Sequence, residues 1–386
     1  MNQNLVYAGL RLWMFGIPRL EYADFLLEKG FKDIVIGYDP ELVEGLRDKG
    51  FNVHIVIGAF RIDNEFREPR FLAEDPYGRK HVWFGSGCPN NPDIRRRTLR
   101  QVSEILEKHD VSSILLDGIR FASMGSGLEA FATCFCENCR NKADKYGYRF
   151  EEMKQSVKKM LNAFYDFKQA WEVLQAYRYS QVGFLDLVKE GSGLLDWLGF
   201  REHSVEEFIV EVRNTIKSYS GKTRLGAYVF TPSLAFLVGQ NYRKFWRHLD
   251  FVKPMVYRRG RGVACLNFEL AKIAEDLLHW NSWLPESELI DVLYRVFGFR
   301  GEEYPLSTKR LFEDCLPISL IKIEFQAAKR LLAGRSELHP IIMLDDPQIE
   351  QAVKIAMETG LDGIDFFSFR EEEKNRISKI SEVIGK

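Results

Sequence analysis

The 386-residue sequence predicts one α/β domain, a (β/α)8 TIM barrel with long insertions after its fourth and sixth strands. Eight short apolar segments, most of them rich in β-branched or aromatic residues, alternate with helix-like patterns or long polar stretches. Some, such as Val53–Phe60, run apolar without alternation, as parallel strands buried on both faces do. Eight such strands close a barrel, and barrels with long loops reach this length as single domains.

The expected strands and helices follow from these two kinds of pattern. The strands are placed at Leu5–Trp13, Asp33–Tyr38, Val53–Phe60, Ser113–Asp117, Arg224–Phe230, Val252–Tyr257, Pro340–Leu344 and Gly363–Phe369. Apolar residues at three-to-four spacing predict helices that pack on the barrel wall, and Asn91 is placed to cap the third of them. These helices are expected at Leu20–Lys29, Pro40–Lys49, Pro92–Lys108, Ser204–Ser218, Leu266–Trp280 and Pro347–Thr359.

Two connections are far longer than a barrel requires, Ala122–Lys222 after the fourth strand and Arg258–His339 after the sixth. Both are expected to build over the carboxyl-terminal mouth, where barrel enzymes carry their substrate loops. The rival architecture is an open doubly wound sheet, which usually carries a glycine-rich phosphate loop after its first strand. The first strand here ends in Arg-Leu-Trp-Met-Phe-Gly and offers no such loop, which favours the barrel.

Composition and charge limit the classes of partner. Lys and Arg number 54 against 55 Asp and Glu, so no global field draws the chain toward nucleic acid or anionic lipid. No apolar run approaches the roughly 18 residues that span a bilayer, and the first residues lack the basic and apolar regions of a signal peptide. We therefore expect a cytoplasmic protein that acts on a small molecule or oligosaccharide. The oligomeric state does not follow from the sequence.

Three of the six cysteines form a C-x-C-x-x-C motif, Cys134, Cys136 and Cys139, which points to a metal. A structural zinc ion takes four soft ligands in a tetrahedron, so a fourth ligand is needed from another loop. Cys88 is the candidate, because its loop follows the third strand and neighbours the loop after the fourth strand in a barrel. Four thiolates leave no open coordination position, which indicates a structural role. Reduced bystanders or a redox pair are the alternatives.

At these four cysteines the chain resembles the family 42 glycoside hydrolases, zinc-containing β-galactosidases. In that family a cysteine after the third strand joins a C-x-C-x-x-C cluster after the fourth. The resemblance implies a barrel and a glycosidase activity. The family's acid/base is a Glu preceded by Asn at the end of the fourth strand, and its nucleophile is a Glu that ends the seventh. This chain has Leu116-Asp117-Gly118 and Leu344-Asp345-Asp346 at these places.

Cleavage of a glycosidic bond generally needs two carboxyl groups facing each other across it. Asp117 ends the fourth expected strand and Asp345 the seventh, so both lie where a barrel places such a pair, and Asp346 is the substitute for Asp345. The alternatives are that Asp117 pairs with Arg120, and that Asp345 or Asp346 caps the helix at Pro347. The carboxyl separation would distinguish a retaining from an inverting enzyme.

Two further likenesses bear on this region. Asn91-Pro92 before a helix, Asp117-Gly118-Ile119-Arg120 and Pro254-Met255-Val256-Tyr257 resemble a broad group of uncharacterised glycosyl-hydrolase-like barrels. The α-amylases are similar in their Asp-Gly-Phe-Arg-x-Asp fourth strand, in which the last Asp is the nucleophile, but Ala122 occupies that place here.

Other residues at or just beyond the expected strand ends suit sugar binding, since arginines offer forked donors and aromatic rings offer planes. They are Arg11, Trp13, Arg61, Asp63, Trp83, Arg120, Tyr257, Arg258 and Arg370, whereas Tyr228 lies inside its strand and is expected in the core.

The sequence thus supports a glycoside hydrolase that acts on an oligosaccharide through Asp117 and Asp345, with zinc bracing the mouth. A carbohydrate-binding barrel without hydrolytic activity is the first alternative, because neither glutamate of family 42 is present. A zinc-dependent deacetylase-type hydrolase is the second. It would need a His/Asp ligand set, and the seven histidines show no H-x-x-x-H or H-x-H spacing.

Overall fold

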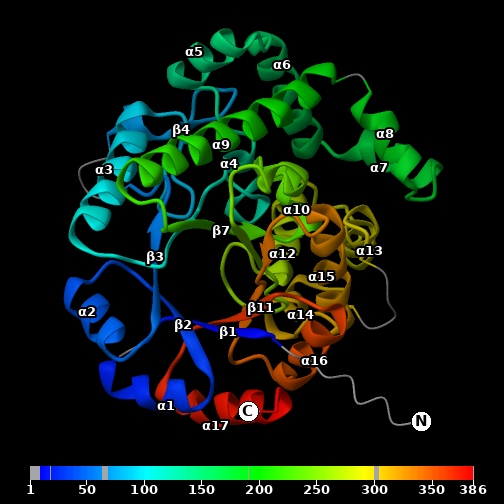
Figure 1. Ribbon diagram of the computed structural model, residues 1–386. Helices are drawn as coiled ribbons and strands as arrows, with labels where there is room; N and C mark the ends of the chain where they lie inside the picture. The colour runs from blue at the N-terminus through cyan, green and yellow to red at the C-terminus, as the bar shows by residue number, and fades with distance from the viewer. Residues whose placement is uncertain (1–8, 18, 63–67, 190, 300–303, 386) are drawn as a thin grey trace.

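The computed structural model describes residues 9–17, 19–62, 68–189, 191–299 and 304–385. Eight parallel strands form a closed barrel, and helices surround it (Figure 1). The strands, in order around the barrel, are β1 (Arg11–Phe15), β2 (Phe31–Ile36), β3 (Asn52–Gly58), β6 (Ser113–Asp117), β7 (Arg224–Phe230), β8 (Phe251–Met255), β10 (Ile341–Met343) and β11 (Gly363–Phe367). Pairing of Ile341 with Met255 and of Arg11 with Gly363 completes the ring. The predicted (β/α)8 barrel is confirmed.

Helices that follow the strands form the outer layer. They are α1 (Ala23–Glu28), α2 (Pro40–Asp48), α3 (Pro92–Lys108), α9 (Ser192–Tyr219), α15 (Ser319–Leu332), α16 (Ile349–Thr359) and α17 (Lys374–Val383). Capping residues explain where several of these helices begin. The side chain of Asn91 accepts from the backbone N–H groups of Asp93 and Ile94, as predicted for the cap of α3, and Asp39 caps α2 in the same way. Pro40 and Pro92 occupy the first positions of their helices.

The remaining elements lie in the connections. After β3 come η3 (Pro69–Phe71) and an antiparallel pair, β4 (Ala73–Glu74) and β5 (Lys80–His81). After β6 come η4 (Met124–Ser126), α4 (Leu128–Phe131), α5 (Glu137–Tyr146), α6 (Phe150–Tyr165), α7 (Lys168–Ala176) and α8 (Gln181–Val188). After β7 come α10 (Pro232–Ala235), η5 (Phe236–Val238) and α11 (Tyr242–Phe245). After β8 come α12 (Leu266–Trp280), α13 (Glu286–Val296), α14 (Thr308–Glu313) and β9 (Glu337–Leu338), and η1 (Leu20–Tyr22) and η6 (Glu371–Glu373) precede α1 and α17.

One helix has a different place from the one predicted. The pattern of Leu266–Trp280 predicted a wall helix, and α12 does span these residues. It packs against η4, α13 and α14, which belong to the connections, whereas α15 packs beside α16 in the outer layer. An apolar stripe shows that a helix is buried on one face, but it does not identify the surface that covers it.

The first strand is also shifted from its predicted position. The sequence placed it at Leu5–Trp13, and β1 runs from Arg11 to Phe15; residues 1–8 lie outside the described part. Arg11 therefore begins its strand at the amino-terminal rim, opposite the mouth. There it bonds the carboxylate of Asp33 at 2.7 Å and lies 3.4 Å from that of Glu337. The prediction that Arg11 lies at the mouth is wrong.

The barrel interior holds charged and aromatic side chains in its middle layer. Lys253 and Asp365 are fully buried, and the Lys253 Nζ donates to Asp365 Oδ2 at 2.9 Å. The Tyr228 hydroxyl donates to the same oxygen at 2.7 Å, so Tyr228 lies in the core. Trp13 is wholly buried, with Lys253 Nζ 3.5 Å from its ring centroid. Trp13 is therefore a core residue rather than a sugar platform, which corrects its predicted role.

No helix in the described ranges is both long and apolar enough to cross a membrane.

Candidate active site at the barrel mouth

Asp117 is the last residue of β6 and lies at the carboxyl-terminal mouth. The run Ser113–Leu116 is fully buried, and at Asp117 the chain leaves the sheet through Gly118, whose φ of +64° suits glycine. The Gly118 N–H donates to Asp117 Oδ1 at 2.8 Å. Burial raises the pKa of the Asp117 carboxyl, although Arg120, this N–H and Arg61 act against the rise. A carboxyl with a raised pKa suits the part of a general acid.

Arg120 lies under the mouth, buried between aromatic rings. Its guanidinium carbon is 4.8 Å from the ring centroid of Trp83 and 4.6 Å from that of Phe230, and it donates to the Phe121 carbonyl at 2.9 Å. Burial lowers the pKa of Arg120 to about 10, against the opposing charges of Glu269 and Asp117. Trp83 is 1% exposed and donates from its indole to the Gly87 carbonyl. Both residues thus support the floor of the site, rather than projecting from it.

Phe84 is an exposed aromatic at this site that sequence reasoning missed. Its side chain is 56% exposed, its ring centroid lies 5.6 Å from the guanidinium carbon of Arg120, and its φ is +48°. A bulky residue in this backbone region is uncommon and costs about 1–3 kcal/mol, so its position is held by the surrounding structure. The only sequence signal was the glycine-rich stretch that follows it. Phe84 offers the mouth an accessible ring face.

Glu269, near the start of α12, ties together two loops of the mouth. Its carboxylate accepts from the Ser123 hydroxyl at 2.9 Å, from the Ala264 N–H at 3.0 Å and from the Gly125 N–H. Burial raises the pKa of Glu269, while these donors and Arg120 lower it. A Cβ at Gly125 would lie 2.5 Å from a Glu269 oxygen, which explains the glycine. Because both its oxygens accept hydrogen bonds from these loops, Glu269 is a scaffold residue.

Asp345 and Asp346 follow β10 and have different surroundings. Asp346 is 3% exposed, and both its oxygens accept from Arg258, at 2.6 and 2.7 Å. Arg258 also donates to the Leu316 carbonyl at 2.6 Å, and Asp346 accepts from the Gln348 N–H at 2.8 Å. This buried pair joins the ends of β8 and β10 to the segment before α15. The structure thus gives Asp346 and Arg258 a structural contact in place of their predicted catalytic and binding roles.

Asp345 is exposed to solvent. Burial raises the pKa of the Cys265 thiol to about 11, and the charges of Glu269 and Asp345 add to the rise. The backbone of Cys265 forms an isolated parallel β-bridge with that of Tyr257, a buried residue. Burial raises the pKa of the Tyr257 hydroxyl, and the charges of Asp365, Cys265 and Asp117 contribute to this. Tyr257 thus lies within electrostatic reach of Asp117.

The other predicted binding residues are spread more widely. Arg61 is exposed, and its backbone forms an antiparallel β-bridge with that of Ser86. The charge of its side chain opposes the rise in the pKa of Asp117. Arg370 is exposed and precedes η6 at the end of β11. Asp63 lies outside the described residues. Of the predicted set, the structure therefore brings Arg61, Arg120 and Tyr257 into the surroundings of Asp117.

The four predicted cysteine ligands come together in a buried cluster. The sulfur atoms of Cys88, Cys134, Cys136 and Cys139 all lie within 4.8 Å of one another. Cys88 Sγ is 3.4 Å from that of Cys136 and 3.6 Å from that of Cys139. A disulfide would need about 2.05 Å, whereas four thiolates about 2.3 Å from a central ion stand about 3.8 Å apart. The spacing fits one tetrahedral metal ion.

Groups around the cluster favour thiolates over thiols. The backbone N–H of Asn90 points to Cys88 Sγ at 3.4 Å, its side-chain amide points to Cys139 Sγ at 3.4 Å, and the Glu74 N–H points to Cys134 Sγ at 3.3 Å. The guanidinium of Arg201 is fully buried and donates to the Thr133 carbonyl, next to Cys134. Amide donors and a buried cation compensate the negative charge of a tetrathiolate site. This is the one such ligand cluster among the described residues.

Comparisons with known proteins support the fold. No family model matches the chain, and no curated protein matches it by sequence. Among solved structures, the chain is similar to the PgaB (BpsB) glycoside hydrolase domain from Bordetella bronchiseptica, at 8% identity and a TM-score of 0.56 over 97% of this chain and 98% of that one. The chain is also similar to the catalytic domain of β-amylase from Paenibacillus polymyxa, at 12% sequence identity and a TM-score of 0.57 over 97% of each chain.

A β-galactosidase from Halorubrum lacusprofundi gives 12% identity and a TM-score of 0.59 over 97% of this chain and 58% of that one, so the chain spans little more than half of its length. At such identities these likenesses establish the barrel, and the chemistry must come from the residues.

Proposed function

We propose that the chain is a glycoside hydrolase that cleaves an oligosaccharide at the carboxyl-terminal mouth of its barrel. The observation that carries the proposal is Asp117, a carboxyl with a burial-raised pKa at the end of β6, within electrostatic range of Arg61 and of Arg120, whose guanidinium lies near the exposed ring of Phe84. Such a carboxyl keeps its proton at higher pH than a free one and can donate it to a leaving oxygen. The three barrels reported above include glycosidases by their names, which accords with this chemistry.

The second carboxyl in the proposed mechanism is Asp345. Around the barrel β7 and β8 separate β6 from β10, so the two aspartates approach the mouth from different sides. Asp117 protonates the glycosidic oxygen as the bond from the anomeric carbon breaks. Asp345 either attacks that carbon or takes a proton from the water that does so, and the carboxyl separation selects between the two courses. Phe84 would stack on a sugar ring, and Arg61 would bond its hydroxyls.

We infer that the cysteine cluster binds zinc with a structural role. Four sulfur ligands at this spacing suit tetrahedral Zn²⁺ and leave no open position on the ion. A series of contacts joins the cluster to the mouth. The indole of Trp83 donates to the carbonyl of Gly87, which precedes Cys88, and the guanidinium of Arg120 stacks on Trp83. A bound ion would fix the loops that carry these residues.

The test is turnover of a panel of aryl glycosides and oligosaccharides by wild type, Asp117→Asn and Asp345→Asn. Asp48→Asn, an exposed aspartate at the end of α2, is the matched control. The proposal expects losses of about 10²–10⁴-fold in kcat for both mouth variants and none for the control. Turnover that survives in Asp117→Asn would refute it.

A carbohydrate-binding barrel without hydrolysis is the second candidate. It is favoured by the presence of aspartates at the two places where the family 42 resemblance expects glutamates. Sugar binding without any turnover by wild type would select it. The deacetylase alternative needs a mixed His/Asp ligand set, and the described residues gather only the cysteines into a set of three or more.

A further inference from the structure

A pocket lies in the connections that follow β6 and β8. It has a volume of about 540 Å³ and is lined by Lys168, Trp171, Glu172, Gln175, Trp283, Pro285 and Glu288. All its lining residues come from α7, in the connection after β6, and from the stretch 283–288, in the connection after β8. Pockets that hold small ligands have volumes of about 300–1,000 Å³ and aromatic walls with a few polar groups. The volume of this pocket falls in that range, and its lining combines two tryptophans and a proline with four polar side chains.

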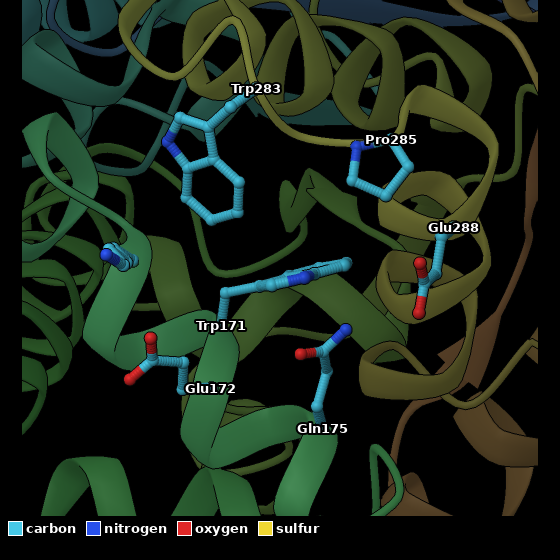
Figure 2. Close-up of a pocket in the computed structure, with 7 residues that line it drawn as sticks. Trp171, Glu172, Gln175, Trp283, Pro285 and Glu288 are labelled. Atoms are coloured by element: carbon cyan, nitrogen blue, oxygen red, sulfur yellow. The ribbon is translucent and has the colours of Figure 1, made fainter.

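One face of α7 forms one wall. Lys168, Trp171, Glu172 and Gln175 recur at the three-to-four spacing that aligns side chains along one side of a helix. Trp171 is 3% exposed, because its ring also packs against Tyr179, with centroids 5.6 Å apart. Figure 2 shows its indole at the centre of the group, with Trp283 and Pro285 on one side and Glu172 and Gln175 on the other.

The opposite wall is held in place by buried hydrogen bonds. Asn281, which is 2% exposed, accepts from the Phe167 N–H at 2.8 Å and donates to the Phe164 carbonyl at 2.9 Å. This side chain therefore fastens the segment that carries Trp283 to the start of α7. The Tyr179 hydroxyl makes a second link by donating to Glu288. The two walls are thus preorganised, while Trp283 remains 50% exposed.

The lining chemistry identifies the class of ligand. The exposed indole of Trp283 suits the C–H face of a sugar ring, and the polar groups include donors, the Lys168 ammonium and the Gln175 amide, as well as acceptors, the carboxylate of Glu172 and the Gln175 carbonyl. A ligand rich in hydroxyls uses both kinds. A methylated ammonium ion would use the rings and the carboxylates, but Lys168 would repel it. A purely apolar ligand would leave the polar groups unpaired.

We propose that this pocket is a second carbohydrate-binding site, separate from the mouth, which holds a neutral oligosaccharide against the exposed indole of Trp283. The inference rests on the proposed function only in expecting the bound sugar to be part of the same substrate. A site on the connections would retain a long chain near the mouth while its bonds are cleaved. It would lower KM for a polymer without affecting the chemistry on a small glycoside.

Calorimetry on Asp117→Asn, which keeps the sugars intact, tests the site with galacto-, malto-, cello- and N-acetylglucosamine hexaoses, each titrated separately. One of them should occupy two sites in Asp117→Asn and one site after Trp283→Ala is added, with affinity at the lost site reduced about tenfold or more. Tyr219→Ala, which removes an aromatic of similar exposure (45%) at the end of α9, should leave both sites. In the background of wild-type Asp117, Trp283→Ala should raise KM for the polymer and leave kcat/KM for an aryl glycoside unchanged.

The inference is overturned if no hexaose shows a site that Trp283→Ala removes, or if tetramethylammonium binds there in a Trp283-dependent way and the sugars do not. Absence of any Trp283-dependent site, together with normal turnover by wild type, would reject this pocket alone. A Trp283-dependent site in a protein without turnover would reject the proposed hydrolysis and keep the pocket. Matched far-ultraviolet circular dichroism of the variants shows that an affinity change does not come from unfolding.

Discussion

The ion pair inside the barrel should be costly to break and inexpensive to replace. Lys253 and Asp365 have no solvent exposure, and the Tyr228 hydroxyl shares the bonded oxygen of Asp365. Burial lowers the pKa of Lys253 to about 8, although the negative charge of Asp365 acts in the other direction. The attraction of the carboxylate thus offsets only part of the effect of burial on the ammonium. A pair with this balance adds little stability as a pair.

From this balance we derive the change in the free energy of unfolding for a single, a double and a triple variant. Lys253→Met keeps most of the volume against Trp13 but leaves a carboxylate buried without its cation, and should lower the free energy of unfolding by about 3–5 kcal/mol. Lys253→Met with Asp365→Leu removes both charges and should recover most of this loss. The remaining deficit should be about 1–3 kcal/mol, because the buried Tyr228 hydroxyl has lost its acceptor. Adding Tyr228→Phe should bring the stability to that of wild type or above.

Urea unfolding followed by circular dichroism and by tryptophan fluorescence gives these free energies, provided that the two transitions coincide. The order expected is the single Lys253 variant below the double variant and the double variant below the triple. The reasoning is refuted if the double variant is no more stable than the single one, because the loss would then come from packing and not from an uncompensated charge. Tyr228→Phe alone is the control for the hydroxyl.

Three further predictions concern the rest of the molecule. Burial lowers the pKa of His54 and of His339 to about 4, so the unfolded chain binds more protons between about pH 4 and 6.5. The free energy of unfolding should therefore fall on acidification through this window, by up to about 1.4 kcal/mol per pH unit for each histidine, and the urea midpoint should fall with it; an unchanged midpoint between pH 7 and 5 would contradict this. Cys136→Ser should reduce the bound metal, measured by elemental analysis, to below about half an equivalent and should lower stability, whereas full metal retention would exclude the site. Arg258→Ala should cost about 3–5 kcal/mol by leaving Asp346 buried and unpaired, and an unchanged urea midpoint would contradict this.

The strand segments could be read from the sequence because burial on both faces leaves a continuous apolar run. Ser113–Asp117 and Arg224–Phe230 were placed residue for residue. The first strand was not, since the apolar run before Arg11 extends the pattern without marking where pairing begins. That shift of a few residues moved Arg11 to the opposite rim and Trp13 into the core, because position along a strand decides which end a side chain approaches.

The candidate site was predictable in part for the same reason. Asp117 and the four cysteines follow from strand ends and loop adjacency, which a barrel fixes. The contacts of Asp346 with Arg258 and the exposure of Phe84 depend on how the connections after β8 and β3 fold, and local spacing carries no record of that. The buried Lys253 and Asp365 did leave a signal, a single charge inside each of two apolar strands. A charge in such a place calls for a partner from another strand.

The cysteine cluster and the proposed acid are mechanically connected, and this explains how a metal without an open position could influence catalysis. Cys88 follows Gly87, whose carbonyl holds the indole of Trp83, and Trp83 supports the guanidinium of Arg120. Arg120 in turn lowers the pKa of the Asp117 carboxyl against the larger effect of burial. A loosened cluster would let Arg120 move from Asp117, and the pKa of the acid would rise further. Metal loss should therefore move the alkaline limb of a pH–activity profile upward while it lowers kcat, whereas a site needed only for folding would lower the active fraction and leave that limb in place.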